Sequence, residues 1–505
     1  MALCHRPECI GRRLFIIAGV EEISIDQAHA AYRDGSLSTT ALVRACLARI
    51  AALDRQGPSL RALIAVNPRA LEEAARLDAA YRSGTVGPLH GIPVILKDNF
   101  DTHDMPTTGG SVAMRASQPR RDAFVVQRLR AAGALILAKA NLQEFARGGV
   151  SVSSLGGQVR NPYDLTRSAG GSSGGTAAAI AANFALLGTG SDTGQSIRSP
   201  ASACCLVGVR PTRGLVSRAG IMPNSFTQDE AGPITRTVRD AARMLDVMAG
   251  FDPRDPVTAL GVGRRPASYA QGLHSAALQG ARIGLLLDMM GGEERHAEVN
   301  RVMEQVVRTM EAQGATVVRL QVDGLAALAA EVGTDRWEAR AAFERYFAEL
   351  GPGQPITSFR QLVDTRTAEP DVQRILEAEI AIEDGLHHPA YLHRLRNRDR
   401  LRILLASCMA SHGLAALLYP LQRVLVARLG EPEQPERNGM LSHGTGFPAV
   451  SFPGGFSSTT ATAPLGVPVG AELLGPDFSE PELLALAYAH EQAARVRRPP
   501  RFVLT

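Results

Sequence analysis

The chain is almost without lysine. Lysine and arginine together number 54 among 505 residues, but only two of these are lysines, Lys97 and Lys139. Arginine cannot replace a lysine that must lose its proton, because the guanidinium group stays charged. A lysine that persists against such a bias is therefore a candidate for a chemical role, with chance retention as the alternative explanation.

Other scarce features exclude whole classes of protein. No run of 18 apolar residues occurs, so no membrane-spanning helix is expected. The six cysteines form no Cys-x-x-Cys pair and His-Glu-x-x-His is absent, which argues against a disulfide framework and the common zinc-hydrolase motif. A net charge of +4 is too small to predict nucleic-acid binding. We expect no metal, no cofactor, no nucleic acid and no membrane partner.

The N-terminus predicts a short extension rather than a secretion signal. Arg12 and Arg13 precede only seven apolar residues, which two glutamates end at once. A cytoplasmic protein is therefore the expectation. Residues 1–20 are interpreted as an N-terminal extension, and 21–505 as one large domain, because no linker or internal repeat interrupts them. A homodimer is the default oligomeric state.

Alternating hydrophobic patterns predict an α/β fold. Helical spacing or long apolar runs predict helices over 39–53, 68–81, 122–132, 176–187 and 480–494, and mostly helix over 293–420. Short apolar runs predict strands at 93–97, 133–138, 449–452 and 469–474. The alternation favours a central mixed, mainly parallel sheet that is wrapped on both faces by helices.

A Gly/Ser-rich segment over 168–175 admits several interpretations. It contains Gly-x-Ser-x-Gly centred on Ser173, which is the pattern of a nucleophile elbow. An elbow needs a strand directly before it, and residues 161–167 look like a turn. A phosphate-binding loop would need Gly-Lys-[Ser/Thr], which is absent. A purely structural turn also explains the glycines.

A better interpretation joins three separate segments, and it rests on a resemblance to the amidase signature family. The matching segments are Gly91-Ile-Pro-Val-Ile-Leu-Lys-Asp98, Gly170-Gly-Ser-Ser-Gly-Gly175 and Gly190-Ser-Asp-Thr-Gly-Gln-Ser-Ile-Arg198. Shorter matches follow in family order, among them Gln228-Asp-Glu-Ala-Gly-Pro233 and Glu472-Leu-Leu-Gly475. The resemblance implies a signature core at about 85–260 and a variable region at about 265–435 that shapes the substrate pocket.

The resemblance implies a Ser-Ser-Lys triad. Ser196 is then the nucleophile, Ser172 a relay on a cis peptide bond, and Lys97 the base. Elementary chemistry agrees with these roles, because a serine hydroxyl needs a base and no histidine lies in the motifs. Burial at the end of an apolar strand favours the neutral form of a lysine.

The residues around the nucleophile have supporting roles in this interpretation. Small residues let backbone N–H groups form an oxyanion hole, for which the candidates are Thr193, Gly194, Gln195 and Ser196. Many members of the family have glycine where Gln195 stands, and a side chain there narrows the pocket or places an amide near the substrate. Asp192, Arg198 and Ser173 are expected to support the loop, with an ordinary ion pair as the alternative for Asp192 and Arg198.

The expected function is that of an amidase, a hydrolase of carbon–nitrogen bonds other than peptide bonds in linear amides. The substrate expected is a small amide with an apolar acyl or aryl group. Four aromatic residues between Trp337 and Phe347 could bind such a group, although core packing is the favoured explanation for them. The alternatives are the A subunit of an aminoacyl-tRNA amidotransferase, an esterase or carbamate hydrolase, and a catalytically silent binding protein.

Overall fold

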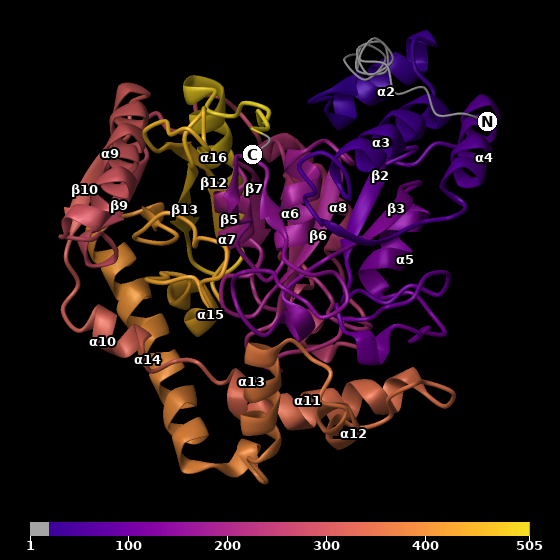
Figure 1. The fold of residues 1–505 in the computed structure, drawn as a ribbon. Helices are drawn as coiled ribbons and strands as arrows, with labels where there is room; N and C mark the ends of the chain where they lie inside the picture. Colours follow the sequence, from indigo (N-terminus) through magenta and orange to yellow (C-terminus); the bar gives the residue numbers. More distant parts are fainter. Residues whose placement is uncertain (1–19, 504–505) are drawn as a thin grey trace.

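A computed structural model describes residues 20–503 (Figure 1). The predicted extension at 1–20 lies outside this range except for its last residue, so it stays a prediction. Over the described residues, no helix is both long and apolar enough to cross a membrane.

The fold is built on one mixed sheet of 11 strands in the order β1-β3-β2-β6-β8-β7-β12-β13-β11-β9-β10. Their bounds are β1 Leu63–Val66, β2 Pro93–Lys97, β3 Leu135–Ala140, β6 Leu187–Asp192, β7 Val207–Arg210, β8 Glu230–Thr235, β9 Arg282–Leu286, β10 Thr316–Leu320, β11 Ala416–Pro420, β12 Ala449–Phe456 and β13 Pro468–Leu474. A separate two-stranded sheet pairs β4 (Arg160–Asn161) with β5 (Asp164–Ser168).

Helices cover both faces of the large sheet (Figure 1). The helices are α2 Ile25–Asp34, α3 Thr39–Leu53, α4 Ala70–Arg82, α5 Phe124–Ala131, α6 Gly174–Ala181, α7 Arg198–Ala203, α8 Val238–Met248, α9 Ala297–Ala312, α10 Leu325–Ala329, α11 Asp335–Leu350, α12 Phe359–Asp364, α13 Pro370–Ile380, α14 Pro389–His412, α15 Met440–Thr445 and α16 Glu480–Ala494. Helix α16 packs on both α8 and α9, and all three pack on the sheet. Helices α6 and α7 pack together on the sheet as well. The expected α/β class, with a mixed sheet between helices, is confirmed.

Several predicted elements are confirmed at or near their expected bounds. The helix at 39–53 and the strand at 93–97 form as predicted, and every residue of β2 is buried. Helix α5 and strand β3 lie within two residues of their predicted positions. These segments have clear periodicity or clear flanking turns, which is where sequence patterns are most informative.

The expectation of a mainly parallel sheet is wrong. Six strand pairs of the large sheet are antiparallel and four are parallel. The parallel pairs lie in two groups, β3-β2-β6 and β11-β9-β10, and antiparallel pairs join these groups through the middle of the sheet. An apolar strand pattern carries no direction, so the sequence did not reveal this.

Two predicted helical stretches also need correction. The helix predicted over 176–187 ends at Ala181, Asn183 takes a positive φ of 61°, and Leu187 already begins β6. The region 293–420 is mostly helical but contains strands β10 and β11. Both errors arise because a short apolar run fits a buried helix and a buried strand equally well.

The sheet brings the candidate residues together. Strands β2 and β6 are parallel neighbours, so their carboxyl ends meet at one edge of the sheet. Lys97 is the last residue of β2 and Asp192 the last of β6. The loop that carries Ser196 follows β6 directly, which places it beside Lys97.

Candidate active site

Lys97 is a buried lysine, and no carboxylate of residues 20–503 lies within ion-pair distance of it. Its side chain is fully buried, and its Nζ lies 2.6 Å from Ser172 Oγ, 2.8 Å from Ser191 Oγ and 3.2 Å from the Ser191 carbonyl oxygen. Burial lowers the pKa of Lys97 from 10.5 to about 7, although the charges of Asp192 and Asp229 oppose the shift. A large part of the Lys97 population is therefore neutral near pH 7, as a general base requires.

The other lysine has a different environment. Lys139, on β3, forms an ion pair with Asp98 at 2.9 Å, and both side chains are fully buried. Its Nζ also donates to Thr107 Oγ1 at 2.9 Å and to the Pro106 carbonyl at 3.0 Å. Because its charge has a partner and its donors are used, Lys139 has the contacts of a structural residue.

Ser172 lies in the glycine-rich turn before α6. The Gly171–Ser172 peptide bond is cis, the geometry that the resemblance implies for the bridging serine. The turn and the start of α6 pack very closely on neighbouring backbone: a Cβ would lie 2.7 Å from the Gly149 carbonyl carbon at Gly171, and 2.0 Å from the Asn141 carbonyl oxygen at Gly175. Glycine is needed there for space, which explains the glycines without a phosphate ligand.

Ser196 lies in the loop between β6 and α7, at the wall of a cleft of about 390 Å³. Its carbonyl accepts a hydrogen bond from the Ser173 N–H at 3.1 Å, which ties the two Gly/Ser-rich segments together. Within residues 20–503, the N–H groups of Gly194, Gln195 and Ser196 donate to no protein acceptor. All three residues line the cleft. These N–H groups are available to a substrate oxygen.

Ser173 does not have the position of an elbow nucleophile. It is fully buried at the start of α6, and its Oγ lies 3.3 Å from the Ser191 carbonyl oxygen. Strand β5 does lie in the segment that looked like a turn, but it ends at Ser168 and belongs to the small second sheet. The structure therefore brings Ser172 and not Ser173 to the lysine.

Asp192 and Arg198 form a buried ion pair rather than a surface one. Arg198 Nε lies 3.0 Å from Asp192 Oδ2, and Arg198 Nη1 lies 2.6 Å from Glu472 Oε1 on β13, with all three side chains fully buried. Arg210 adds a second pair to Asp192 at 2.9 Å. These arginine charges hold the pKa of Asp192 below its usual range against the effect of burial.

This ion cluster holds the loop that carries Ser196. Asp192 Oδ2 accepts from the Ile197 N–H at 3.0 Å, and Arg198 Nη2 donates to the Gly194 carbonyl at 2.6 Å. Both ends of the Ser196 loop are thus attached to charged groups, Asp192 at the end of β6 and Arg198 at the start of α7. The loop is held in one conformation, as a preorganised set of N–H donors requires.

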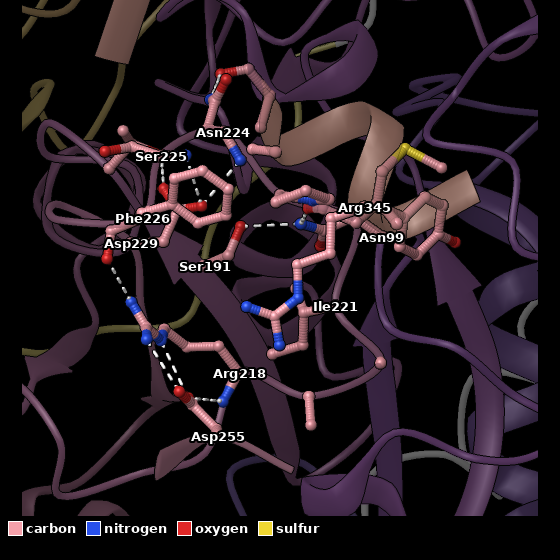
Figure 2. A pocket seen from close by; sticks show the side chains of 18 of the residues that line it. Asn99, Ser191, Arg218, Ile221, Asn224, Ser225, Phe226, Asp229, Asp255 and Arg345 are labelled. Atoms are coloured by element: carbon pink, nitrogen blue, oxygen red, sulfur yellow. Dashed lines mark hydrogen bonds and ion pairs between the residues drawn. The ribbon is translucent and has the colours of Figure 1, made fainter. Parts of the chain in front are cut away.

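Figure 2 shows a smaller cavity of about 80 Å³, which shares Thr193 and Asn224 with the cleft as lining residues. Asn99 donates from Nδ2 to Ser191 Oγ at 2.9 Å on its wall, which orients the hydroxyl that faces Lys97. Asp229 accepts from Thr193 Oγ1 at 2.6 Å and from the Asn224 and Ser225 N–H groups. Asp229 therefore supports the loop through Thr193.

Sequence reasoning missed three groups that contribute to the site. Ser191 contacts the lysine directly, although it lies inside a segment that the motif analysis quoted. Arg147 and Glu379, paired at 3.0 Å, line the cleft from a loop and from α13. No spacing pattern relates these two residues, because they are 232 positions apart.

The aromatic residues of α11 pack in the core. Trp337, Phe343, Tyr346 and Phe347 are all less than a tenth exposed, and the last three belong to a cluster with residues of α12 and α13. None of the four lines the cleft at Ser196. The favoured interpretation of these residues as core packing is confirmed. Of the four, Tyr346 also lines a smaller cavity that includes Ser191.

One group of side chains in the described range has the spacing of a metal site. His103, Asp104 and Asp122 place ligand atoms within 4.8 Å of one another. Arg130 already pairs with both carboxylates, at 2.8 and 3.0 Å. The carboxylates are therefore neutralised by an arginine, and none of the three residues lines the Ser196 cleft.

Comparisons with known proteins agree with this geometry. The sequence model of the Amidase family matches residues 41–484. A peptide amidase from Stenotrophomonas maltophilia has a similar structure, with a TM-score of 0.86 and 38% identity over 96% of this chain and 99% of that one.

Two curated relatives are similar over nearly their whole length. A probable amidase of Arabidopsis thaliana is 32% identical over 97% of this chain and 94% of its own. The A subunit of the glutamyl-tRNA(Gln) amidotransferase of Moorella thermoacetica is 35% identical over 95% of both chains. With the family match across most of the sequence and the Lys97–Ser172 pair at its centre, this chain belongs to the amidase signature family.

Proposed function

We propose that the protein hydrolyses a linear carboxylic amide to an acid and an amine or ammonia through an acyl-enzyme on Ser196. The observation that carries the proposal is the buried contact of 2.6 Å between Lys97 Nζ and Ser172 Oγ, at a lysine whose pKa is lowered to about 7. Membership of a family of carbon–nitrogen hydrolases supports the proposal.

In the first step the proton of Ser196 moves toward Lys97. Neutral Lys97 accepts the proton of the Ser172 hydroxyl, and Ser172 accepts that of Ser196 as Ser196 Oγ attacks the amide carbonyl. The ammonium that forms on Lys97 stays within hydrogen-bond distance of the Ser191 hydroxyl and carbonyl oxygens. Both are acceptors for the new charge.

The second step breaks the carbon–nitrogen bond. The N–H groups of Gly194, Gln195 and Ser196 stabilise the negative oxygen of the tetrahedral intermediate, and Thr193 holds the loop in place. The proton on Lys97 returns through Ser172 to the leaving nitrogen. A water molecule then repeats the sequence on the acyl-enzyme and regenerates the Ser196 hydroxyl.

Covalent labelling tests the nucleophile. After treatment with phenylmethylsulfonyl fluoride or a fluorophosphonate, we expect the intact mass to rise by one adduct in the wild type and in Ser173→Ala. We expect no adduct in Ser196→Ala, because the attacking oxygen is gone. An adduct that persists in Ser196→Ala and disappears in Ser173→Ala contradicts the assignment.

The pH dependence of turnover tests the base. Because Lys97 must be neutral to accept a proton, kcat/KM for an amide is expected to rise with pH, to reach half its maximum at about pH 7 and to level off above it. A rate that is flat from pH 5.5 to 8.5 in a three-component buffer of constant ionic strength would count against Lys97 as base. Substrate ionisation is excluded by the use of an uncharged amide.

A second candidate function is that of an amidotransferase A subunit, favoured by the 35% identity to the Moorella protein. The two functions are separated by assay of the isolated chain. Steady hydrolysis of simple amides without any partner protein supports the amidase. Hydrolysis of glutamine that requires co-purified subunits supports the amidotransferase. Relative kcat/KM values for an amide and its matched ester or carbamate decide the remaining alternative.

A further inference from the structure

Gln195 occupies an unusual position beside the nucleophile. It directly precedes Ser196, lines the cleft, and is only 4% exposed. The mechanism proposed above uses only the backbone N–H of Gln195, so it leaves the side chain without a role.

The orientation of the Gln195 amide is fixed by the backbone of residue 439. The Gly439 N–H donates to Gln195 Oε1 at 3.2 Å, so the oxygen end of the amide is identified by its donor. A Cβ at Gly439 would lie 2.4 Å from Gln195 Cβ, while Gly439 itself has an ordinary φ of −64°. Glycine is required at 439 because a larger residue would collide with Gln195, and not because of its backbone conformation.

This arrangement leaves the nitrogen end of the amide without a partner. Within the described chain, Gln195 Nε2 is buried and donates to no protein atom. Buried donors are nearly always paired in native proteins, so an orphan at the wall of a cleft calls for an explanation. An acceptor on the bound substrate supplies one.

Other side chains of the same cleft also have unused polar atoms. Arg147 Nη1 and Nη2 and His443 Nδ1 have no partner among the described residues. The same holds for Asn224 Oδ1, which must be the oxygen because the Nδ2 end donates to the Ala146 carbonyl at 2.8 Å. The cleft therefore offers donors and an acceptor together, which is the complement of a chain that carries both C=O and N–H groups.

We propose that Gln195 is a specificity-determining residue that donates from Nε2 to a carbonyl oxygen of the acyl chain other than the scissile one. The preferred acyl groups are then peptide-like, with a second carbonyl near the amide that is cleaved. This inference rests on the proposed amidase function. It replaces the apolar acyl or aryl group expected from the sequence, because amide, imidazole and guanidinium side chains line the cleft and none of the α11 aromatics does.

A pair of isosteric substrates tests the proposal. The probes are N-acetylphenylalaninamide and 2-benzylpentanamide, which share the scissile amide and the benzyl group but carry an acetamido and a propyl group, respectively. For the wild type we expect kcat/KM for the acetamido amide to exceed that for the plain amide by at least about tenfold, the value of one hydrogen bond in a desolvated site. The ratio of the two kcat/KM values is the measured preference. A wild-type ratio near one overturns the proposal, whatever the variants do.

The variants assign the preference to the side chain. Gln195→Glu keeps the shape and the acceptor for the Gly439 N–H but replaces the donor by an oxygen, so the ratio is expected to fall by about tenfold or more. Gln195→Ala removes the donor without adding charge and should lower the ratio similarly. Met440→Leu is the control, because Met440 lines the same cleft without a hydrogen-bond donor, and its ratio should stay within twofold of the wild type.

The outcomes separate this inference from the proposed function. If the wild type cleaves neither amide and takes no serine-directed label, the proposed function fails. If the wild type cleaves both and the ratio is unchanged in Gln195→Glu and Gln195→Ala, only the role of Gln195 fails. If kcat falls equally for both substrates in the variants, Gln195 acts on the oxyanion instead, and the specificity role is overturned.

Discussion

Replacement of Lys97 by arginine is expected to reduce kcat/KM at pH 7 by a factor of about 10²–10⁴ or more, the contribution of a general base. Arginine keeps the positive charge and much of the length of lysine, but its guanidinium does not release a proton in this pH range. Ser172 then has no group to accept its proton. Lys97 is partly neutral at pH 7 only because burial lowers its pKa. A guanidinium at the same place stays charged.

The chain supplies its own control for this experiment. Lys139→Arg makes the same substitution at the other buried lysine, where the role is to neutralise Asp98 and not to accept a proton. We expect the folded Lys139→Arg protein to retain its rate within about tenfold, with some loss of stability from the larger side chain. Lys97→Met, which removes the charge altogether, should be as inactive as Lys97→Arg. Substantial turnover by Lys97→Arg at pH 7 contradicts the neutral-lysine mechanism.

The largest effect on stability is expected from Arg198→Met. The substitution removes the ionic partner of Glu472 and one of the two partners of Asp192 while all neighbours remain buried. An uncompensated buried charge destabilises a protein by about 3–5 kcal/mol. We therefore expect the free energy of unfolding, measured by denaturant titration at pH 7, to fall by that amount.

A surface pair provides the comparison for Arg198. Arg319 and Glu304 lie 2.8 Å apart, with side chains 47% and 40% exposed. Exposed pairs contribute about 0–1 kcal/mol, so Arg319→Met should have little effect. If Arg198→Met costs no more than Arg319→Met, the cluster does not hold the nucleophile loop as described.

The central contacts of the site were more predictable than its surroundings. Lys97, Ser172 and Ser196 lie within short segments that resemble family motifs, and the sheet places two of those segments at the ends of neighbouring parallel strands. Lysine scarcity was a second signal, but it marked Lys139 as well as Lys97 and could not separate their roles. The structure places Lys97 and Ser172 in contact and leaves the roles to the experiments above.

What the sequence did not reveal are relations between distant segments. Glu472 reaches Arg198 across 274 positions, and Gly439 reaches Gln195 across 244. Such contacts depend on strand order and on which face of a sheet a residue occupies, and neither has a local pattern. For the same reason the direction of the strands and the two strands inside the helical region 293–420 were missed.

The burial of both lysines has a consequence for amine chemistry. With Lys97 and Lys139 fully buried, the folded surface of the described chain offers no lysine amine to acylating labels, aldehyde cross-linkers or lysine-specific proteases. Reagents that modify amines therefore gain access to the side chains of this protein only when the sheet opens around β2 and β3. Their rate of reaction reports the opening of the catalytic core itself, without any engineered probe.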